Sequence, residues 1–281
     1  MAMPNLALVP PPSVPRHAAL VRSAPGLGRR ALPRVATSLP VRLHVAGLPA
    51  GLDARTRDLS AGGLCVATPS CFPVQELRRI TLFLPAGRID LGVEGRWQAE
   101  VSGEDGILTG VRLLDVPDAS LELIWDLVHT QSKSLTRWLA QQPTFEGLGF
   151  QSLVDLAHVT RLREARAGQL LYRHGVLDDS IFIVTRGEVA FEQRTPHHYK
   201  LSVGLAGPGQ VVGGAGVVAD LVPRETAIVS RDVSLLEISR GAFENLQETN
   251  RGLAFRLVSI VLHSHLRRIE DALHRVVGER R

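Results

Sequence analysis

The chain has 281 residues, of which 44% are hydrophobic and 21% are charged, an ordinary balance for a globular protein with well-buried cores. Its formal net charge is +4, and it contains no dense basic block of the kind that binds nucleic acid. No apolar run approaches the ~20 residues needed to span a bilayer, and the proline-rich first residues lack the pattern of a secretion signal. We therefore expect a cytoplasmic protein of two domains that binds neither nucleic acid nor membrane.

The first half of the chain predicts a leader and a β domain. Residues 1–27 are rich in proline, which suits an extended, flexible leader. From Val41 onward, short apolar runs of strand length alternate with clusters of Gly, Pro, Asp and Ser. This close spacing is typical of a small β barrel or sandwich, and we assign residues 28–116 to it.

The period of the apolar residues then changes. Between Pro117 and Gln142 they recur at steps of three, four and seven: Leu121, Trp125, Val128, Leu135 and Leu139. These steps predict one long amphipathic helix. The segment QQPTFEGLGF breaks this pattern, so we expect residues 117–142 to link two domains.

A short helix is predicted at Gln151 to Arg161, and strand-like runs separated by glycines or turn residues then return. They predict a second β domain over residues 145–248. The expected fold class is therefore mainly β with flanking helices, in which two β domains are joined by a long helix.

The last segment, residues 249–281, is predicted to be a helix with two apolar stripes. One stripe follows the a and d positions of a heptad, with Ser259 as its polar member: Phe255, Leu262, Leu266, Ile269, Leu273 and Val276. The other stripe is suited to pack on its own domain: Leu253, Leu257, Ile260 and Val261. A homodimer through the heptad stripe is the expected consequence.

Two short motifs in the first domain carry candidate binding chemistry. RRALPR gives Arg30 and Arg34 in an R-x-x-x-R spacing, and DLSAGG gives Asp58, Ser60 and Gly63 in a D-x-S-x-x-G spacing. Arginines on a flexible leader can close over phosphates and stack on guanine. A carboxylate and a hydroxyl can accept hydrogen bonds from guanine, and a glycine permits close approach of the backbone.

Taken singly, each motif would also suit a solvated basic leader or an ordinary Asx turn. In this order, 24 residues apart and before a small β barrel, they resemble the PilZ domain, a receptor for the bacterial second messenger cyclic dimeric GMP (c-di-GMP). The resemblance covers residues 28 to about 139. It implies that the two arginines hold the phosphates and guanines of the dinucleotide, while the aspartate, serine and glycine form the barrel side of the site.

The glycine framework of the second domain carries another resemblance. GQLLYRHGVLDDSIFIVTRGEV, followed by GPGQVVGG and VPRETA, is similar to a cyclic nucleotide-binding domain of the catabolite-activator type over residues 145 to about 277. The resemblance implies a β jelly roll with a phosphate-binding cassette at Val211 to Ala227. In that family, the N-terminus of a short helix and an arginine hold the cyclic phosphate, and a glutamate binds the ribose 2′-hydroxyl.

The match at the cassette is incomplete. Gly213 and Arg224 fit the pattern, and Thr226 lies near the small hydroxyl residue that often follows the arginine, but Gly214 stands where the family has its glutamate. Restoring a carboxylate with Gly214→Glu is therefore expected to raise the affinity for cyclic AMP. Glu225, the neighbour of Arg224 in the sequence, is placed to neutralise that arginine. Three alternatives stay open: weak or altered binding of a cyclic mononucleotide such as cAMP or cGMP, binding of another ligand, or a silent pocket that serves as a dimerisation scaffold.

Taken together, these patterns predict a protein without catalytic activity. No nucleophile elbow, Walker loop or zinc motif occurs, no metal or cofactor is expected, and no helix-turn-helix follows the last helix. We expect a second-messenger effector in which the first domain binds c-di-GMP and the second dimerises and relays the signal to a downstream protein. One alternative is a dual sensor whose second domain binds a cyclic mononucleotide and gates the first, and another is a structural adaptor with both pockets silent.

Overall fold

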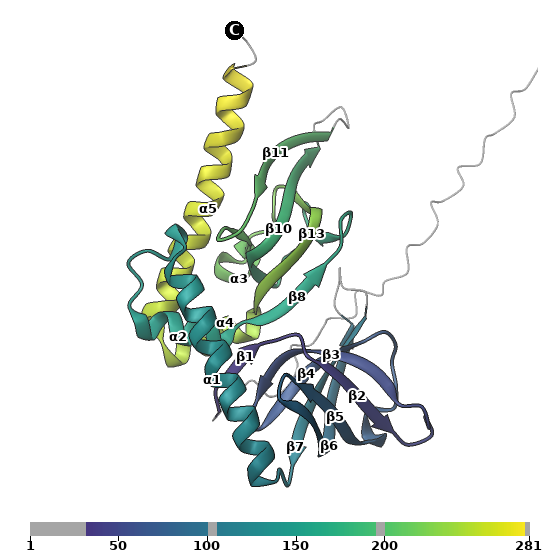
Figure 1. Cartoon of the computed structure of the whole chain (residues 1–281). Helices are drawn as coiled ribbons and strands as arrows, with labels where there is room; N and C mark the ends of the chain where they lie inside the picture. The colour runs from purple at the N-terminus through teal and green to yellow at the C-terminus, as the bar shows by residue number, and fades with distance from the viewer. Residues whose placement is uncertain (1–31, 101–105, 195–199, 279–281) are drawn as a thin grey trace, which may run out of the picture.

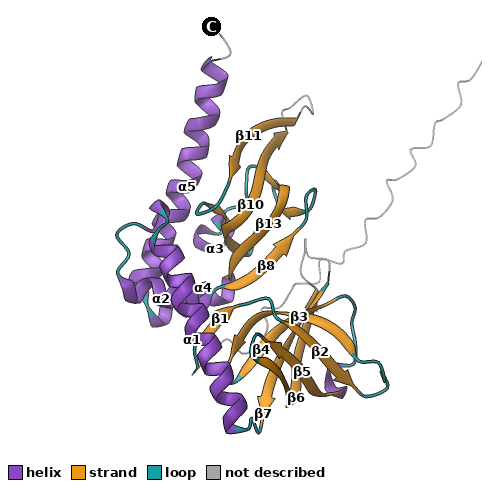
Figure 2. Ribbon diagram, viewed as in Figure 1, coloured by secondary structure: helices purple, strands orange, loops and turns teal. Residues whose placement is uncertain are grey.

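The computed structural model describes residues 32–100, 106–194 and 200–278, with the side chains of the last helix described up to Asp271 (Figure 1). Two antiparallel β domains follow each other along the chain, and a long helix runs beside both (Figure 1). Helices α1, α2, α4 and α5 gather on one side of the strands (Figure 2). The fold class is therefore mainly β with flanking helices, as the sequence predicts.

The first domain is a closed barrel. Its strands are β1 (Arg34–Ala36), β2 (Pro40–Val45), β3 (Leu52–Ser60), β4 (Gly63–Thr68), β5 (Leu77–Leu84), β6 (Gly87–Glu100) and β7 (Ile107–Leu114), with a 3-10 turn η1 (Val74–Glu76) before β5. They are ordered β1-β3-β2-β5-β6-β7-β4, and β3 also pairs with β4, which closes the ring of β2 to β7. β1 extends the pairing of β3 beyond the end of β2.

Alternation of side chains along the strands fills the barrel. Leu59 and Leu64 are opposite each other on β3 and β4, and both belong to the buried core, as does Val35 of β1. The next residues along these strands therefore point to the outer surface. Helix α1 (Asp118–Ala140) packs Ile124 and Val128 on the same core.

Helix α1 corresponds to the linking helix expected over residues 117–142. Its last turns join the core of the second domain, where Leu139 is fully buried. One helix thus contributes side chains to the cores of both domains. Strand β1 lies beside it and beside α2 (Phe150–Val159), and Ala36 packs against the core of the second domain.

The second domain is a roll of antiparallel strands ordered β11-β10-β13-β8, with β12 paired to β10 and β9 to β13. After η2 (Pro143–Phe145) and α2, the elements are β8 (Arg161–Ala165), β9 (Leu170–Tyr172), β10 (Ser180–Arg194), β11 (Lys200–Ala206), β12 (Val211–Gly213), α3 (Ala215–Ala219), β13 (Thr226–Ser239), α4 (Arg240–Thr249) and α5 (Arg251–Gly278). Alternate residues of β10 face two cores. Ile181 and Ile183 meet the helices, whereas Phe182 and Val184 fill the roll.

Helix α5 separates its two apolar stripes as the periodicity predicts. Leu253, Leu257 and Val261 are buried against their own domain. The described members of the heptad stripe are exposed instead, at 70% for Phe255, 46% for Leu262 and 57% each for Leu266 and Ile269. Within the described parts of the chain, no helix is long and apolar enough to cross a bilayer.

Candidate functional site

The strand register brings the D-x-S-x-x-G residues and Arg34 onto one outer face of the barrel. Arg34 is opposite Ser60, and Ser60 is opposite Gly63. Asp58 lies two residues before Ser60 on β3 and therefore points to the same side. Arg30 falls outside the described residues, so the structure reports on four of the five predicted binding residues and brings those four together.

Arg34 and Asp58 form the centre of this face. The Arg34 guanidinium donates to Oδ1 of Asp58, and the backbone N–H of Cys65 donates to the same oxygen at 3.0 Å. The Asp58 side chain is only 2% exposed, whereas that of Arg34 is 21% exposed. A buried carboxylate is costly unless it is paired and hydrogen-bonded. The two motifs therefore depend on each other structurally.

Ser60 and Gly63 shape the tight turn between β3 and β4. The Ser60 hydroxyl donates to the backbone carbonyl of Gly63 at 2.9 Å. A Cβ on Gly63 would lie 2.5 Å from the carbonyl oxygen of Val111 and 3.4 Å from Nη2 of Arg34. Only glycine fits here, because the strands approach too closely for any side chain.

The register extends this face to an arginine that the sequence motifs do not include. Gly63 is opposite Arg112 on β7, and Arg112 is opposite Glu94 on β6. The Arg112 side chain is 61% exposed and lies 3.9 Å from Glu94, which also accepts from Arg96 at 2.9 Å. The alternation of side chains in the GVRLL run indicates that Arg112 points outward. It does not show that Arg112 lies beside Gly63, because that depends on the β4–β7 pairing.

Arg34, Ser60, Gly63 and Arg112 form one row of facing residues across the strands. A second row, two residues further along the strands, ends in an aromatic ring. Asp58 is opposite Cys65, Cys65 is opposite Gly110, and Gly110 is opposite Trp97. The indole lies directly on Gly110, where a Cβ would come within 2.1 Å of Nε1. The small residues Gly63, Cys65 and Gly110 thus lie between the indole of Trp97 and the guanidinium groups of Arg34 and Arg112.

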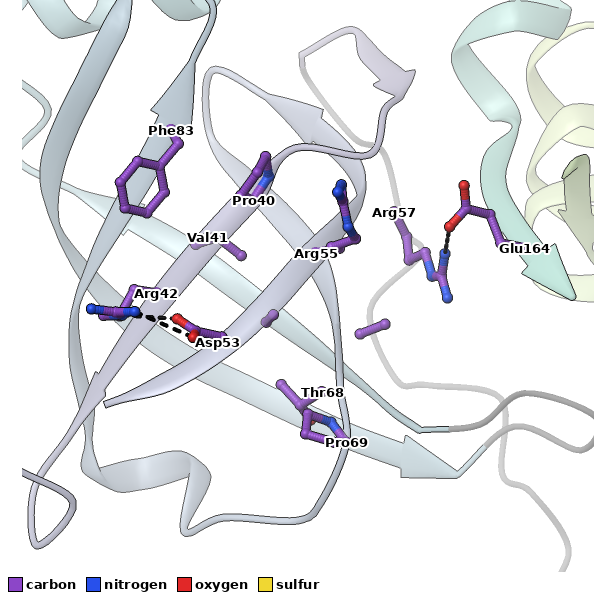
Figure 3. A pocket seen from close by; sticks show the side chains of 12 residues that line it. Pro40, Val41, Arg42, Asp53, Arg55, Arg57, Thr68, Pro69, Phe83 and Glu164 are labelled. Atoms are coloured by element: carbon purple, nitrogen blue, oxygen red, sulfur yellow. Dashed lines mark hydrogen bonds and ion pairs between the residues drawn. The ribbon is translucent and has the colours of Figure 1, made fainter. Parts of the chain in front are cut away.

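An open pocket of about 690 Å³ adjoins these rows on the same strand β3 (Figure 3). Arg42 on its rim is paired with Asp53 at 2.8 Å. Arg57, which immediately precedes Asp58, reaches across to the second domain, where its Nη1 lies 3.9 Å from Oε2 of Glu164 on β8. The pocket therefore opens at the junction of the two domains, and its volume is within the range of small-molecule sites.

The cassette of the second domain is built differently from the family pattern. Gly213 and Gly214 both have a left-handed backbone, with φ of +73° and +87°. The N–H of Gly214 donates to Oδ2 of the buried Asp178 at 2.8 Å. A Cβ at Gly214 would lie 2.8 Å from a side-chain carbon of Ile181. This backbone does not accommodate the glutamate that we expected to restore there, because both the conformation and the space exclude a side chain.

The remaining cassette residues are not gathered around these glycines. The Arg224 side chain is exposed and, within the described parts of the chain, makes no ion pair or hydrogen bond. The hydroxyl of Thr226 accepts from the backbone N–H of His174 at 3.1 Å. Glu225 does not neutralise Arg224 as expected. It points inward and pairs with Arg268 of α5.

Two family models match the chain. The model for the PilZ domain matches residues 28–129, which span the barrel and the first half of α1. The model for the cyclic nucleotide-binding domain matches residues 162–250, from β8 to the start of α5. Both resemblances drawn from the sequence are thereby confirmed, in the expected order.

Curated relatives match only part of the chain. A lysophospholipase of Aspergillus fumigatus is 26% identical over 117 residues, which are 42% of this chain and 7% of that protein. A lysophospholipase of Yarrowia lipolytica is 28% identical over 180 residues, or 56% of this chain and 12% of that protein. The chain therefore spans about a tenth of the length of these relatives.

Solved structures give low similarity. The cyclic nucleotide-binding domain from Methylobacillus flagellatus aligns at a TM-score of 0.46 and 15% identity, covering 53% of this chain and 84% of that chain. The catabolite activator protein of Thermus thermophilus aligns at 0.41 and 21% identity, covering 48% and 63%. Both TM-scores are below 0.5, so neither alignment adds to the domain assignment.

The buried Asp178 carboxyl beside the cassette has a raised pKa. Burial raises the pKa of Asp178 to about 6, although the N–H groups of Gly214 and Ser180 that donate to it act in the opposite direction. The folded protein therefore holds a proton on this group more tightly than the unfolded chain does. Its contribution to stability is present at low pH and is lost as the pH rises from about 4 to about 6.

We predict that Asp178→Asn removes this pH dependence. The rise of about two pKa units corresponds to roughly 3 kcal/mol of unfolding free energy that the wild-type protein loses across the window. Chemical denaturation at pH 4.5 and pH 6.5 measures about 2 kcal/mol of this loss, with Asp126→Asn on the exposed face of α1 as the matched control. Equal pH slopes for the wild type and Asp178→Asn would contradict the assignment.

Proposed function

We propose that this chain, which carries a PilZ domain followed by a cyclic nucleotide-binding domain, is a non-enzymatic second-messenger effector that binds c-di-GMP on the outer face of its barrel. The observation that carries the proposal is the contact between the two motifs. Arg34 pairs with Asp58 directly, beside Ser60 and Gly63. The residues that the resemblance assigns to one ligand thus adjoin one another: Arg34 is half-buried, and Asp58, Ser60 and Gly63 are buried.

The chemistry of this face suits a guanine dinucleotide. The O6 and N7 atoms of guanine accept from an arginine fork such as that of Arg34, which the buried Asp58 carboxylate holds in place. The phosphodiesters carry one negative charge each, which Arg34 and the neighbouring Arg112 can balance. Gly63 and Gly110 carry no side chains because the Val111 carbonyl and the Trp97 indole already lie against them.

Relay of the signal is supported by the elements next to this face. β1 contacts α1 and α2, and α1 places side chains in the cores of both domains. A change at Arg34 therefore has a short path to the second domain, whose downstream partner is a separate protein. The cassette geometry does not favour the dual-sensor alternative, because Asp178 already occupies the N–H of Gly214.

We predict that the double variant Arg30→Ala/Arg34→Ala loses c-di-GMP affinity by at least about a hundredfold. Each arginine contributes a charge-assisted hydrogen bond worth about 1.5 to 3 kcal/mol. Calorimetric titration measures the loss, and Arg78→Ala on the opposite, exposed part of β5 should bind like the wild type. Arg34→Lys keeps the charge next to Asp58 but not the fork, so it separates loss of ligand contacts from loss of folding. Unchanged affinity in the double variant would remove the site assignment.

We also propose that the protein is a homodimer through α5. The proposal is supported by the exposure of the heptad stripe, which includes Leu262, Leu266 and Ile269, on a helix whose other stripe is buried in its own domain. Apolar residues at a and d positions gain stability by interlocking with a second helix.

We predict that Leu266→Glu/Ile269→Glu yields monomers, because like charges would meet across the seam of the dimer. Light scattering coupled to size exclusion measures the mass. Glu270→Gln, on the solvent side of the same turn, should leave the dimer intact. A monomeric wild type at micromolar concentration would show that the stripe has another role.

A further inference from the structure

The carboxylate of Glu225 is enclosed between the roll and α5. Its side chain is 15% exposed. The Tyr172 hydroxyl donates to Oε1 at 3.1 Å, and the same oxygen lies 3.5 Å from Nη2 of Arg268 and 3.6 Å from Nδ1 of His265. An enclosed carboxylate is tolerated only with such partners.

Arg268 connects this carboxylate to three parts of the second domain. It projects from α5 and is 12% exposed. Its Nη1 donates to the carbonyl of Val211 at 3.2 Å and to the hydroxyl of Ser264 at 2.9 Å. Its guanidinium lies 4.4 Å from the ring centroid of Phe191. One arginine thus fastens α5 to β10 and β12 and to the residue that leads into β13.

His265 completes the enclosure as a neutral group. Burial and the adjacent charge of Arg268 lower the pKa of His265, with burial the larger cause. Nδ1 of the imidazole can therefore accept the hydrogen bond that Arg268 Nη2 donates at 2.7 Å. Because His265 is neutral, the negative charge next to the Arg268 side chain comes from Glu225.

This arrangement sits beside the cassette glycines. The Tyr172 ring comes within 3.2 Å of the place where a Cβ on Gly213 would stand, and Val211 begins the strand that ends at Gly213. Two inward-facing groups that could bind an anion are paired with the chain's own carboxylates: Asp178 accepts from the N–H of Gly214, and Glu225 pairs with Arg268. Arg224, the arginine of the cassette sequence, is exposed instead.

We infer that Glu225 is an internal ligand of the second domain: its carboxylate fills an anion position beside the cassette, fastens α5 to the roll, and excludes cyclic phosphates. A phosphate anion of a cyclic nucleotide would bind Arg268 only by displacing this carboxylate. The inference does not depend on c-di-GMP binding by the first domain, since every group in it belongs to the second.

Hydrogen exchange of the ligand-free, full-length protein tests the fastening of α5. In Glu225→Ala, we expect the amides of residues 262–271 to lose protection by about 10- to 100-fold, the range given by one hydrogen bond to a charged group. The barrel amides should be unchanged, and Glu248→Ala on the exposed side of α4 should behave like the wild type. Unchanged protection of residues 262–271 in Glu225→Ala would overturn the inference.

A second variant keeps the test decisive if Glu225→Ala unfolds. Glu225→Gln and Arg268→Gln each break the same pair without shortening the side chain greatly, and their double variant should lose no more protection than the larger single loss. Additive losses would show that the two residues act independently and would also overturn the inference.

Titration with cyclic AMP tests the exclusion of anions. The wild type should bind no cyclic AMP up to 1 mM, whereas Glu225→Ala, or Glu225→Gln where the alanine variant is unstable, should gain measurable binding on the order of tenfold or more. Binding by the wild type at or below about 1 mM, or no gain in either variant, would overturn the exclusion. Binding of c-di-GMP, followed in the same samples, reports separately on the first domain.

Discussion

The ion pair between Arg34 and Asp58 links the candidate face of the barrel to β1, and β1 in turn contacts the helices of the second domain. It fixes β1 against β3, where Val35 enters the core of the barrel while Ala36 packs on the core of the second domain. The same pair occupies the centre of the candidate c-di-GMP face. Because Asp58 is buried, its charge needs a partner whether or not a ligand is bound. The Asp58 carboxylate therefore links the position of β1 on β3 to any contact that Arg34 makes with a ligand.

The junction behind this face is rich in buried charge. Arg57, the neighbour of Asp58, lies near Glu164 and contributes to the field around Glu237. Burial alone would raise the pKa of Glu237, but nearby arginines and the hydroxyl of Ser180, which donates at 2.6 Å, lower it. Ser180 in turn donates its backbone N–H to Asp178, which holds the cassette. Electrostatic attraction between Arg57 and Glu237 thus joins the barrel to the hydrogen bonds that run from Glu237 through Ser180 and Asp178 to the cassette.

The sequence predicts the features that arise from local periodicity. The linking helix expected over residues 117–142 is observed at Asp118–Ala140, and the two stripes of α5 separate as expected, because both depend on the 3.6-residue repeat. Features that depend on strand pairing are not predictable in this way. Arg112 joins the candidate face through the β4–β7 register, and Glu225 meets Arg268 from a distant helix. The sequence also cannot reveal that Gly214 has a left-handed backbone with no room for a side chain.

Mapping the c-di-GMP footprint by hydrogen exchange tests the central claim most directly, because it reports which backbone segments a ligand covers. On addition of c-di-GMP, we expect increased protection in residues 34–36 and 58–65 and around Arg112. Residues 211–227 of the cassette should not be covered. Protection that appears at the cassette and not on the barrel face, or no protection at saturating c-di-GMP, would contradict the account.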